Sequence, residues 1–186
     1  MVLTGVLLAA GAGSRMGLPK ALVRDPDGTS WLVRSIEVLR AAGCDDVVVV
    51  LGARAEEARP LAPSDVRVVI ADDWAEGMAA SLRCGLRALD AGDLAVVTLV
   101  DLPDVGPDVV RRVVAAASGP ATLARASYDG LPGHPVLLGR DHWSPIVADV
   151  SGDQGAKGYL RRHDCALVEC GDLASGADQD EPAPRR

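Results

Sequence analysis

Short apolar runs alternate with helix-like segments along this chain, and the alternation limits the folds that it can adopt. Four mainly apolar runs have the length of strands and suit a parallel sheet covered on both faces: residues 3–8, 47–51, 66–70 and 95–100. Helix patterns follow these runs, over residues 31–42, 53–58, 77–89 and 107–117. This order predicts an α/β fold, a three-layer sandwich with right-handed crossovers and helices on both faces of the sheet.

The second half of the chain carries weaker strand patterns. Residues 121–126, 135–138 and 166–169 predict an antiparallel or mixed edge on the mostly parallel sheet. The 186 residues suit a single domain, and we expect 171–186 to form a partly mobile tail, because that stretch is rich in Asp, Gly, Ala and Pro. Since the chain has no Phe, we expect Val, Leu, Ile and Ala to build the core.

Charge and composition exclude several classes of protein. The formal net charge of −7 repels polyanions and only 3% of residues are aromatic, so we expect no nucleic-acid partner. No window approaches the ~20 apolar residues of a membrane span, so we expect a cytoplasmic protein without a membrane partner. The cysteines form no C-x-x-C pair, which predicts four buried thiols rather than a zinc or redox site: Cys44, Cys84, Cys165 and Cys170.

A glycine-rich loop with two basic side chains follows the first predicted strand. Gly11, Gly13 and Gly17 can adopt positive φ and let main-chain N–H groups approach oxyanions. Arg15 and Lys20 add the positive charge that backbone dipoles alone do not supply. The loop is therefore expected to hold a phosphate chain and not only to turn the backbone from strand to helix.

Two better-known glycine loops fit this stretch less well. A Walker loop needs Ser or Thr after its lysine, but Ala21 follows Lys20. The dinucleotide pattern G-x-G-x-x-G fails at Met16, although a looser spacing that ends at Gly17 keeps an NADP-binding reductase open, with Arg54 on the 2′-phosphate. Against that alternative, the second strand begins roughly 30 residues after the loop instead of the ~20 expected.

The string from Leu8 to Lys20 closely resembles the signature L-A-A-G-x-G-x-R-M-G-x-x-K of the nucleotidyltransferase superfamily that includes molybdenum-cofactor cytidylyltransferases and guanylyltransferases. The resemblance implies a fold like that of nucleotide-diphospho-sugar transferases. It also implies catalytic roles for Arg15 and Lys20. The nucleotide-binding set that it implies is Leu8, Ala9, Ala10, Gly11, Gly13, Ser14, Arg15 and Lys20.

Asp101 directly follows the fourth predicted strand, at the edge where ligands gather in such sheets. A hard carboxylate there suits Mg²⁺ on nucleotide phosphates, although an aspartate before Pro103 can also be a simple turn residue. In the family that the chain resembles, the matching aspartate holds the catalytic magnesium, and a D-x-D-x-P segment supplies a second metal carboxylate. That segment matches Asp180 here, but the chain stops four residues after Pro182, which leaves an acidic disordered tail as the alternative.

Three further blocks resemble the same family. Residues 73–86 contain W-x-x-G-M-x-x-S-L-x-x-G-L, which implies that Ser81 lies near the nucleotide base. Residues 133–136 and 152–157 resemble the G-H-P and G-D-x-G-A-[R/K] blocks that face the acceptor, which implies substrate-side roles for His134, Asp153 and Lys157. Taken alone, His134 is an extended residue before proline, and Asp153 could equally cap a helix that runs to residue 163.

Together these motifs predict a magnesium-dependent nucleotidyltransferase that moves CMP from CTP to the phosphate of molybdenum cofactor and releases pyrophosphate. The Ala9-Ala10-Gly11 entry resembles the cytidylyl branch, whereas the guanylyl branch more often reads A-G-G. The resemblance also implies a molybdenum hydroxylase as a partner. Guanylyl transfer, uridylyl or other sugar-phosphate transfer, and a catalytically silent cofactor carrier stay open as alternatives.

Overall fold

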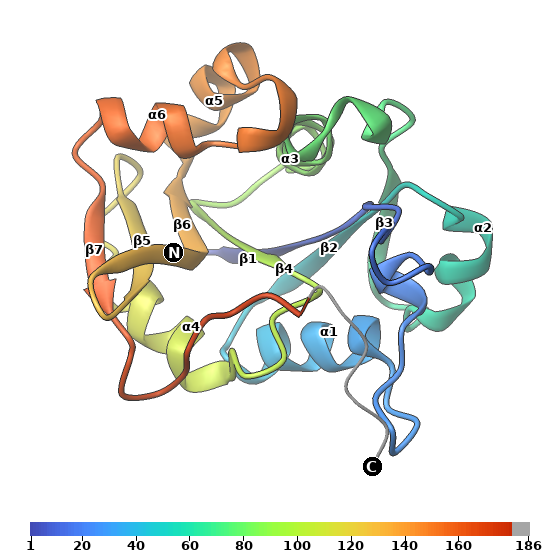
Figure 1. The fold of residues 1–186 in the computed structure, drawn as a ribbon. Coiled ribbons are helices and arrows are strands. Elements are labelled where there is room, and N and C mark those ends of the chain that lie inside the picture. The colour runs from blue at the N-terminus through green and yellow to red at the C-terminus, as the bar shows by residue number, and fades with distance from the viewer. Residues whose placement is uncertain (180–186) are drawn as a thin grey trace.

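A computed structural model of the chain, described here over residues 1–179, has one sheet with helices on both faces (Figure 1). Strands β1 to β4 run parallel, β6 runs antiparallel to both β4 and β5, and β7 runs parallel to β5. The order across the sheet is β3-β2-β1-β4-β6-β5-β7. The strands of this described part are β1 Leu3–Ala9, β2 Asp46–Leu51, β3 Arg67–Ile70, β4 Leu94–Leu99, β5 Leu123–Tyr128, β6 Leu131–Gly139 and β7 Ala166–Glu169.

Helices α3, α5 and α6 cover one face of the sheet, and α1 and α4 cover the other (Figure 1). The three-layer α/β prediction with a mixed second half is therefore confirmed. Within residues 1–179, no helix is both long and apolar enough to cross a membrane. The helices are α1 Trp31–Ala41, α2 Ala55–Ala58, α3 Met78–Arg87, α4 Pro107–Val114, α5 Trp143–Asp149 and α6 Lys157–Arg162.

The core lies in two layers, one on each face of the sheet. One layer buries the apolar stripe of α1, including Leu32 and Ile36, and the other buries Leu82 and Leu86 of α3. Aliphatic residues dominate both layers as expected, but aromatic side chains add to each: Trp31 and Tyr128 to one, Trp143 and Tyr159 to the other. The indole of Trp31 is only 1% exposed. Its Nε1–H donates to Asp25 Oδ1 at 2.7 Å, so burial leaves this polar group satisfied.

Helix α1 begins at Trp31 as predicted, whereas the start of α6 differs from the prediction. Ser30 stands at the N-cap of α1, but its buried Oγ makes no hydrogen bond within the described part of the chain. Helix α6 begins at Lys157 with Ala156 as its N-cap, and Asp153 lies in a separate 3-10 turn over Gly152–Gln154. The interpretation of Asp153 as a helix cap is therefore wrong. Gly155, at φ +50°, ends the 3-10 turn, so the backbone is not helical from Asp153 to Lys157.

Part of the segment expected to be mobile is tied to the rest of the domain. The backbone N–H and the Oγ of Ser175 both donate to Asp104 Oδ2 at 2.6 Å. The N–H of Gln179 donates to the carbonyl of Asp101 at 2.9 Å. Residues 171–179 thus return from the end of β7 to the end of β4.

The cysteines agree only in part with the prediction of four buried thiols. All four are free, but Cys170 alone is fully buried, while Cys44, Cys84 and Cys165 are partly exposed. Burial raises the pKa of the Cys44 thiol to about 12, so it stays protonated and unreactive at neutral pH.

The carboxylate of Glu169 joins the end of β7 to the turn between β5 and β6. It accepts hydrogen bonds from the N–H groups of Gly171, Gly130 and Asp129 at 2.9 to 3.1 Å, and from Ser127 Oγ at 2.9 Å. These donors, that of Gly171 first, lower the pKa of Glu169 from 4.5 to about 2.

We expect Glu169→Gln to lower the urea midpoint of unfolding at neutral pH, because the amide cannot accept all four hydrogen bonds as a carboxylate does. The folded-state pKa is depressed, so this contribution to stability is present above pH 4.5 and is lost as the pH falls through about 2. The difference between variant and wild type should therefore shrink across that window. Glu56→Gln, at an exposed position on α2, is the control, and equal midpoints for wild type and Glu169→Gln at neutral pH would contradict the prediction.

Candidate functional site

A pocket of about 520 Å³ opens at the carboxyl ends of β1 and β4. Residues from the glycine loop, from α3 and from the segment after β4 line it together. Asp101 and Asp153 are among them. The lining also includes every residue expected to contact the nucleotide: Leu8, Ala9, Ala10, Gly11, Gly13, Ser14, Arg15, Lys20 and Ser81.

The glycine loop takes its shape from Gly13 and Gly17, which have φ values of +60° and +70°. A Cβ at Gly13 would lie 2.0 Å from the carbonyl oxygen of Leu18, so only glycine fits there. Gly11 differs from the prediction, because its φ is not positive and a Cβ there would meet nothing within 4 Å. Gly11 thus leaves the backbone open toward the pocket instead of making the turn.

Lys20 and Asp101 meet in this pocket although 81 residues separate them in the chain. Lys20 Nζ forms an ion pair with Asp101 Oδ2, and the two side chains are 17% and 12% exposed. Asp101 Oδ1 is buried and accepts no hydrogen bond from any residue that the structure describes. A buried carboxylate oxygen without a donor is costly in the protein alone, and a cation would offset that cost.

The described residues supply few other ligands for a metal. No group of three or more His, Cys, Asp or Glu side chains within positions 1–179 is arranged to hold a metal ion. Asp101 is therefore the central candidate ligand, with Asp153 on the same pocket wall. Asp180, which the sequence suggested as the second carboxylate, lies outside the described residues.

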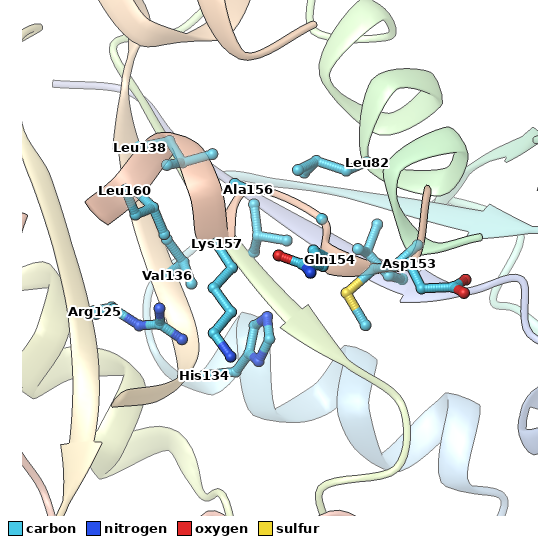
Figure 2. Close-up of a pocket in the computed structure, with 14 residues that line it drawn as sticks. Leu82, Arg125, His134, Val136, Leu138, Asp153, Gln154, Ala156, Lys157 and Leu160 are labelled. Atoms are coloured by element: carbon cyan, nitrogen blue, oxygen red, sulfur yellow. The ribbon is translucent and has the colours of Figure 1, made fainter. Parts of the chain in front are cut away.

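A second pocket of about 310 Å³ adjoins the first and shares Leu8, Met78 and Asp153 with it. Its lining includes His134 and Lys157, so the structure brings the expected substrate-side residues together. In Figure 2 the side chain of Lys157 points toward His134, and the carboxylate of Asp153 points away from both.

Gly77 allows two segments that line the pockets to pack closely against each other. Gly77, at φ +113°, lies so close to the Gly152–Gln154 turn that a Cβ would be 2.2 Å from Asp153 Oδ1. This close approach packs the start of α3 against the turn. The segments that contain the W-x-x-G-M and G-D-x-G blocks thus pack against each other.

Arg125 on β5 is a pocket residue that the sequence analysis missed. Its Nε and Nη2 donate to the carbonyl of Gly133 at 3.1 and 3.0 Å, and its guanidinium points toward Lys157 and His134 (Figure 2). Burial lowers the pKa of Arg125, and it forms no ion pair with a carboxylate of residues 1–179. Arg125 reaches the pocket because β5 pairs with the strand that carries the G-H-P block, and this pairing leaves no signal in the sequence around Arg125.

His134 contributes no positive charge to this pocket at neutral pH. Burial, and then the nearby charge of Arg125, lower the pKa of His134 to about 4. Its carbonyl accepts a hydrogen bond from the hydroxyl of Tyr128 at 2.6 Å, which fixes the strand around it. The positive charge of the second pocket therefore comes from Arg125 and Lys157.

The NADP-binding alternative requires Arg54 to contact the 2′-phosphate of the ligand. Arg54 lines neither pocket and pairs with Glu57 at 2.6 Å on the surface of α2.

Comparison with known proteins assigns the family. The profile of the MobA-like NTP transferase domain matches residues 5–166, from β1 to the start of β7. The chain belongs to the MobA-like NTP transferase family. As a MobA-like NTP transferase it is a nucleotidyltransferase enzyme, which confirms the resemblance stated from its motifs.

Relatives of this MobA-like chain carry names of different kinds. Nicotine blue oxidoreductase from Paenarthrobacter nicotinovorans is 35% identical over 95% of the chain and 91% of that protein. A probable molybdenum cofactor guanylyltransferase from Rhodopirellula baltica is 36% identical over 61% of the chain, but only 55% of that protein is covered. The crystal structure of Rv0371C in complex with manganese, from Mycobacterium tuberculosis H37Rv, superposes with a TM-score of 0.78 at 31% identity, covering 96% and 94% of the two chains.

Proposed function

We propose that this MobA-like enzyme transfers CMP from CTP to the phosphate of a phosphorylated acceptor, molybdenum cofactor by preference, and releases pyrophosphate. One observation carries the proposal. The pocket that holds the glycine loop, Lys20 and Asp101 adjoins a second pocket with two cations, so a triphosphate and a phosphorylated acceptor have separate places that meet at a shared wall.

In this proposal the nucleotide side of the site neutralises charge. Main-chain N–H groups of the glycine loop and the Lys20 ammonium hold the triphosphate, and Arg15 lies over the same pocket. An oxygen of the acceptor phosphate attacks the α-phosphorus, the bond to the β-phosphate oxygen breaks, and pyrophosphate leaves with that electron pair. An ionised phosphate needs no general base, in keeping with a neutral His134 on the acceptor side.

Asp101 would hold the divalent metal, magnesium by preference. Its buried and unpartnered Oδ1 fits a hard cation, and the manganese complex of the similar Rv0371C supports a divalent ion in this fold. When bound, such an ion supplies Lewis-acid stabilisation of charge on the phosphate oxygens. Lys20, which pairs with Asp101, would then contact both the carboxylate and the phosphate chain.

The choice of CTP depends on the loop entry Ala9-Ala10-Gly11, which resembles cytidylyl enzymes. The relative from Rhodopirellula baltica is named a guanylyltransferase, so GTP is the nucleotide to compare. We expect CTP with molybdenum cofactor to give the fastest pyrophosphate release among the four ribonucleoside triphosphates. A metal chelator should abolish it, and glucose 1-phosphate should replace the acceptor poorly. Faster release from GTP would contradict the choice of cytosine as the base. No release from any triphosphate would contradict nucleotidyl transfer.

A second candidate function is a reductase that uses NADPH, since the oxidoreductase relative covers nearly the whole chain. The ion pair of Arg54 with Glu57, away from both pockets, counts against the phosphate contact that this alternative requires. Fluorescence titration with NADPH, in parallel with CTP and magnesium, separates the two. Tight NADPH binding without metal would favour the reductase.

A further inference from the structure

Residues 171–179 form a C-terminal strap that is bonded to the segment after β4. The N–H and the Oγ of Ser175 both donate to Asp104 Oδ2, and the N–H of Gln179 donates to the carbonyl of Asp101. In Figure 1 the strap is the red segment that passes α4 and reaches the end of β4. The strap therefore contacts the same short segment that brings the pocket carboxylate to the site.

Asp101 lies just past the end of the sheet, where its main chain takes a partner from the strap. The N–H of Val100 donates to the carbonyl of Leu8 at 3.2 Å, next to the last paired residues of β4 and β1. One residue further, the Asp101 carbonyl accepts from the strap instead. The strap thus fixes the main chain of the residue whose buried Oδ1 makes it the central candidate for a metal ligand.

Tyr128 on β5 sets the position of the strap through Gly176. Gly176 has φ +65°, and a Cβ there would lie 2.0 Å from Tyr128 Cε2. The ring has little room to move away, because it is buried and a Cβ on Gly133 would lie 2.7 Å from the same atom. Its hydroxyl is also bonded to the carbonyl of His134 at 2.6 Å. Any side chain at position 176 must therefore displace the strap and not the ring.

We propose that Tyr128 is a positioning residue for the metal site. It seats the strap at Gly176, the strap holds the segment after β4, and the Asp101 carboxylate is thereby kept where it binds the divalent ion. Tyr128 and Gly176 both lie outside the two pockets, so their effect on the metal passes through the strap. The inference rests on the proposed function, since it concerns the metal of the same site.

Gly176→Ala tests this inference, because the added methyl group moves the strap from a position outside the pockets. Manganese binding in the presence of CTP, followed by electron paramagnetic resonance, should weaken about tenfold to a hundredfold, as for other residues that orient a metal ligand. Tyr128→Leu, which removes the ring, should weaken it on the same scale. The affinity for CTP without metal, measured by fluorescence titration, should stay unchanged because the glycine loop is untouched.

Gly43→Ala is the matched control. Gly43, at φ +97°, follows α1 and has open space around its Cβ position, so this substitution strains the backbone without moving the strap. It should leave manganese affinity unchanged. Thermal unfolding of each variant checks that it folds, and Gly176→Ala, in the terminal strap, decides the matter if Tyr128→Leu does not fold.

Manganese affinity equal to that of wild type in the folded variants would overturn the inference. Asp101→Asn, measured in the same way, separates this outcome from a failure of the proposed function. If Asp101→Asn loses manganese while Gly176→Ala keeps it, the strap has no part in metal binding and the metal role of Asp101 stands. If Asp101→Asn also keeps manganese, the metal role of Asp101 and the positioning role of Tyr128 are both wrong.

Discussion

Replacing Asp101 by asparagine is expected to lower the rate of pyrophosphate release by about a hundredfold to a thousandfold, the scale of losing one electrostatic contact to the transition state. Asparagine keeps the shape of the side chain but removes the charge that would hold the metal. It also removes the ion pair between Asp101 and the Lys20 ammonium, whose side chain is 17% exposed. Manganese binding in the presence of CTP, followed by electron paramagnetic resonance, should weaken in parallel.

Asp108→Asn is the matched control for this variant. Asp108 lies on α4, seven positions further along the chain, and pairs with Arg111 on an exposed helix face away from both pockets. Its asparagine variant should keep wild-type rates and metal affinity. Retention of activity and manganese binding by Asp101→Asn would remove the metal role that we assign to this carboxylate.

Gly13→Ala is expected to produce the largest loss of stability within the glycine loop. At φ +60° an alanine is strained by about 1–3 kcal/mol. The added methyl group would also meet the Leu18 carbonyl at 2.0 Å, so the backbone must move. Affinity for CTP, measured by fluorescence titration, should fall because the moved loop no longer presents its N–H groups.

Alanine substitutions at two other glycines of the loop distinguish backbone strain from the steric contact with the Leu18 carbonyl. Gly17 has φ +70° but open space around its Cβ position, so Gly17→Ala should cost only the backbone strain of about 1 kcal/mol. Gly11 has neither constraint, so Gly11→Ala should leave the free energy of unfolding unchanged. An equal effect of all three substitutions in urea unfolding would show that the Leu18 contact does not shape the loop.

Most of the sheet could be predicted because its strands are short, apolar and bounded by clear turn residues. The second half was harder: β6 begins at Leu131, which is 73% exposed, four residues before the predicted start at Pro135. Helix α5 escaped prediction because its seven residues include Pro145 and are too few to show a full apolar period. Its buried residues, Trp143 and Ile146, are three positions apart and pack against α3.

The gathering of Gly13, Arg15 and Lys20 in one pocket could be predicted, because contiguous motifs place them in one loop. Arg125 could not, because it is a lone arginine in a weak strand pattern. Its meaning depends on the register shift in β5 and on the Gly133 carbonyl across the ladder. Motif recognition finds local chemistry, whereas strand pairing creates this contact between residues eight positions apart.

Strand β6 is antiparallel to both of its neighbours and separates two regions of the sheet, each next to one of the pockets. In the proposed function, the triphosphate contacts come from the loops after the parallel strands β1 and β4, while the acceptor-side cations come from β5, beyond β6 in the sheet, and from α6. Only Leu8, Met78 and Asp153 line both pockets. Mutations in the β5–β6 hairpin can therefore change which ligand the second pocket binds while the glycine loop stays intact. Similar chains could acquire different activities in this way.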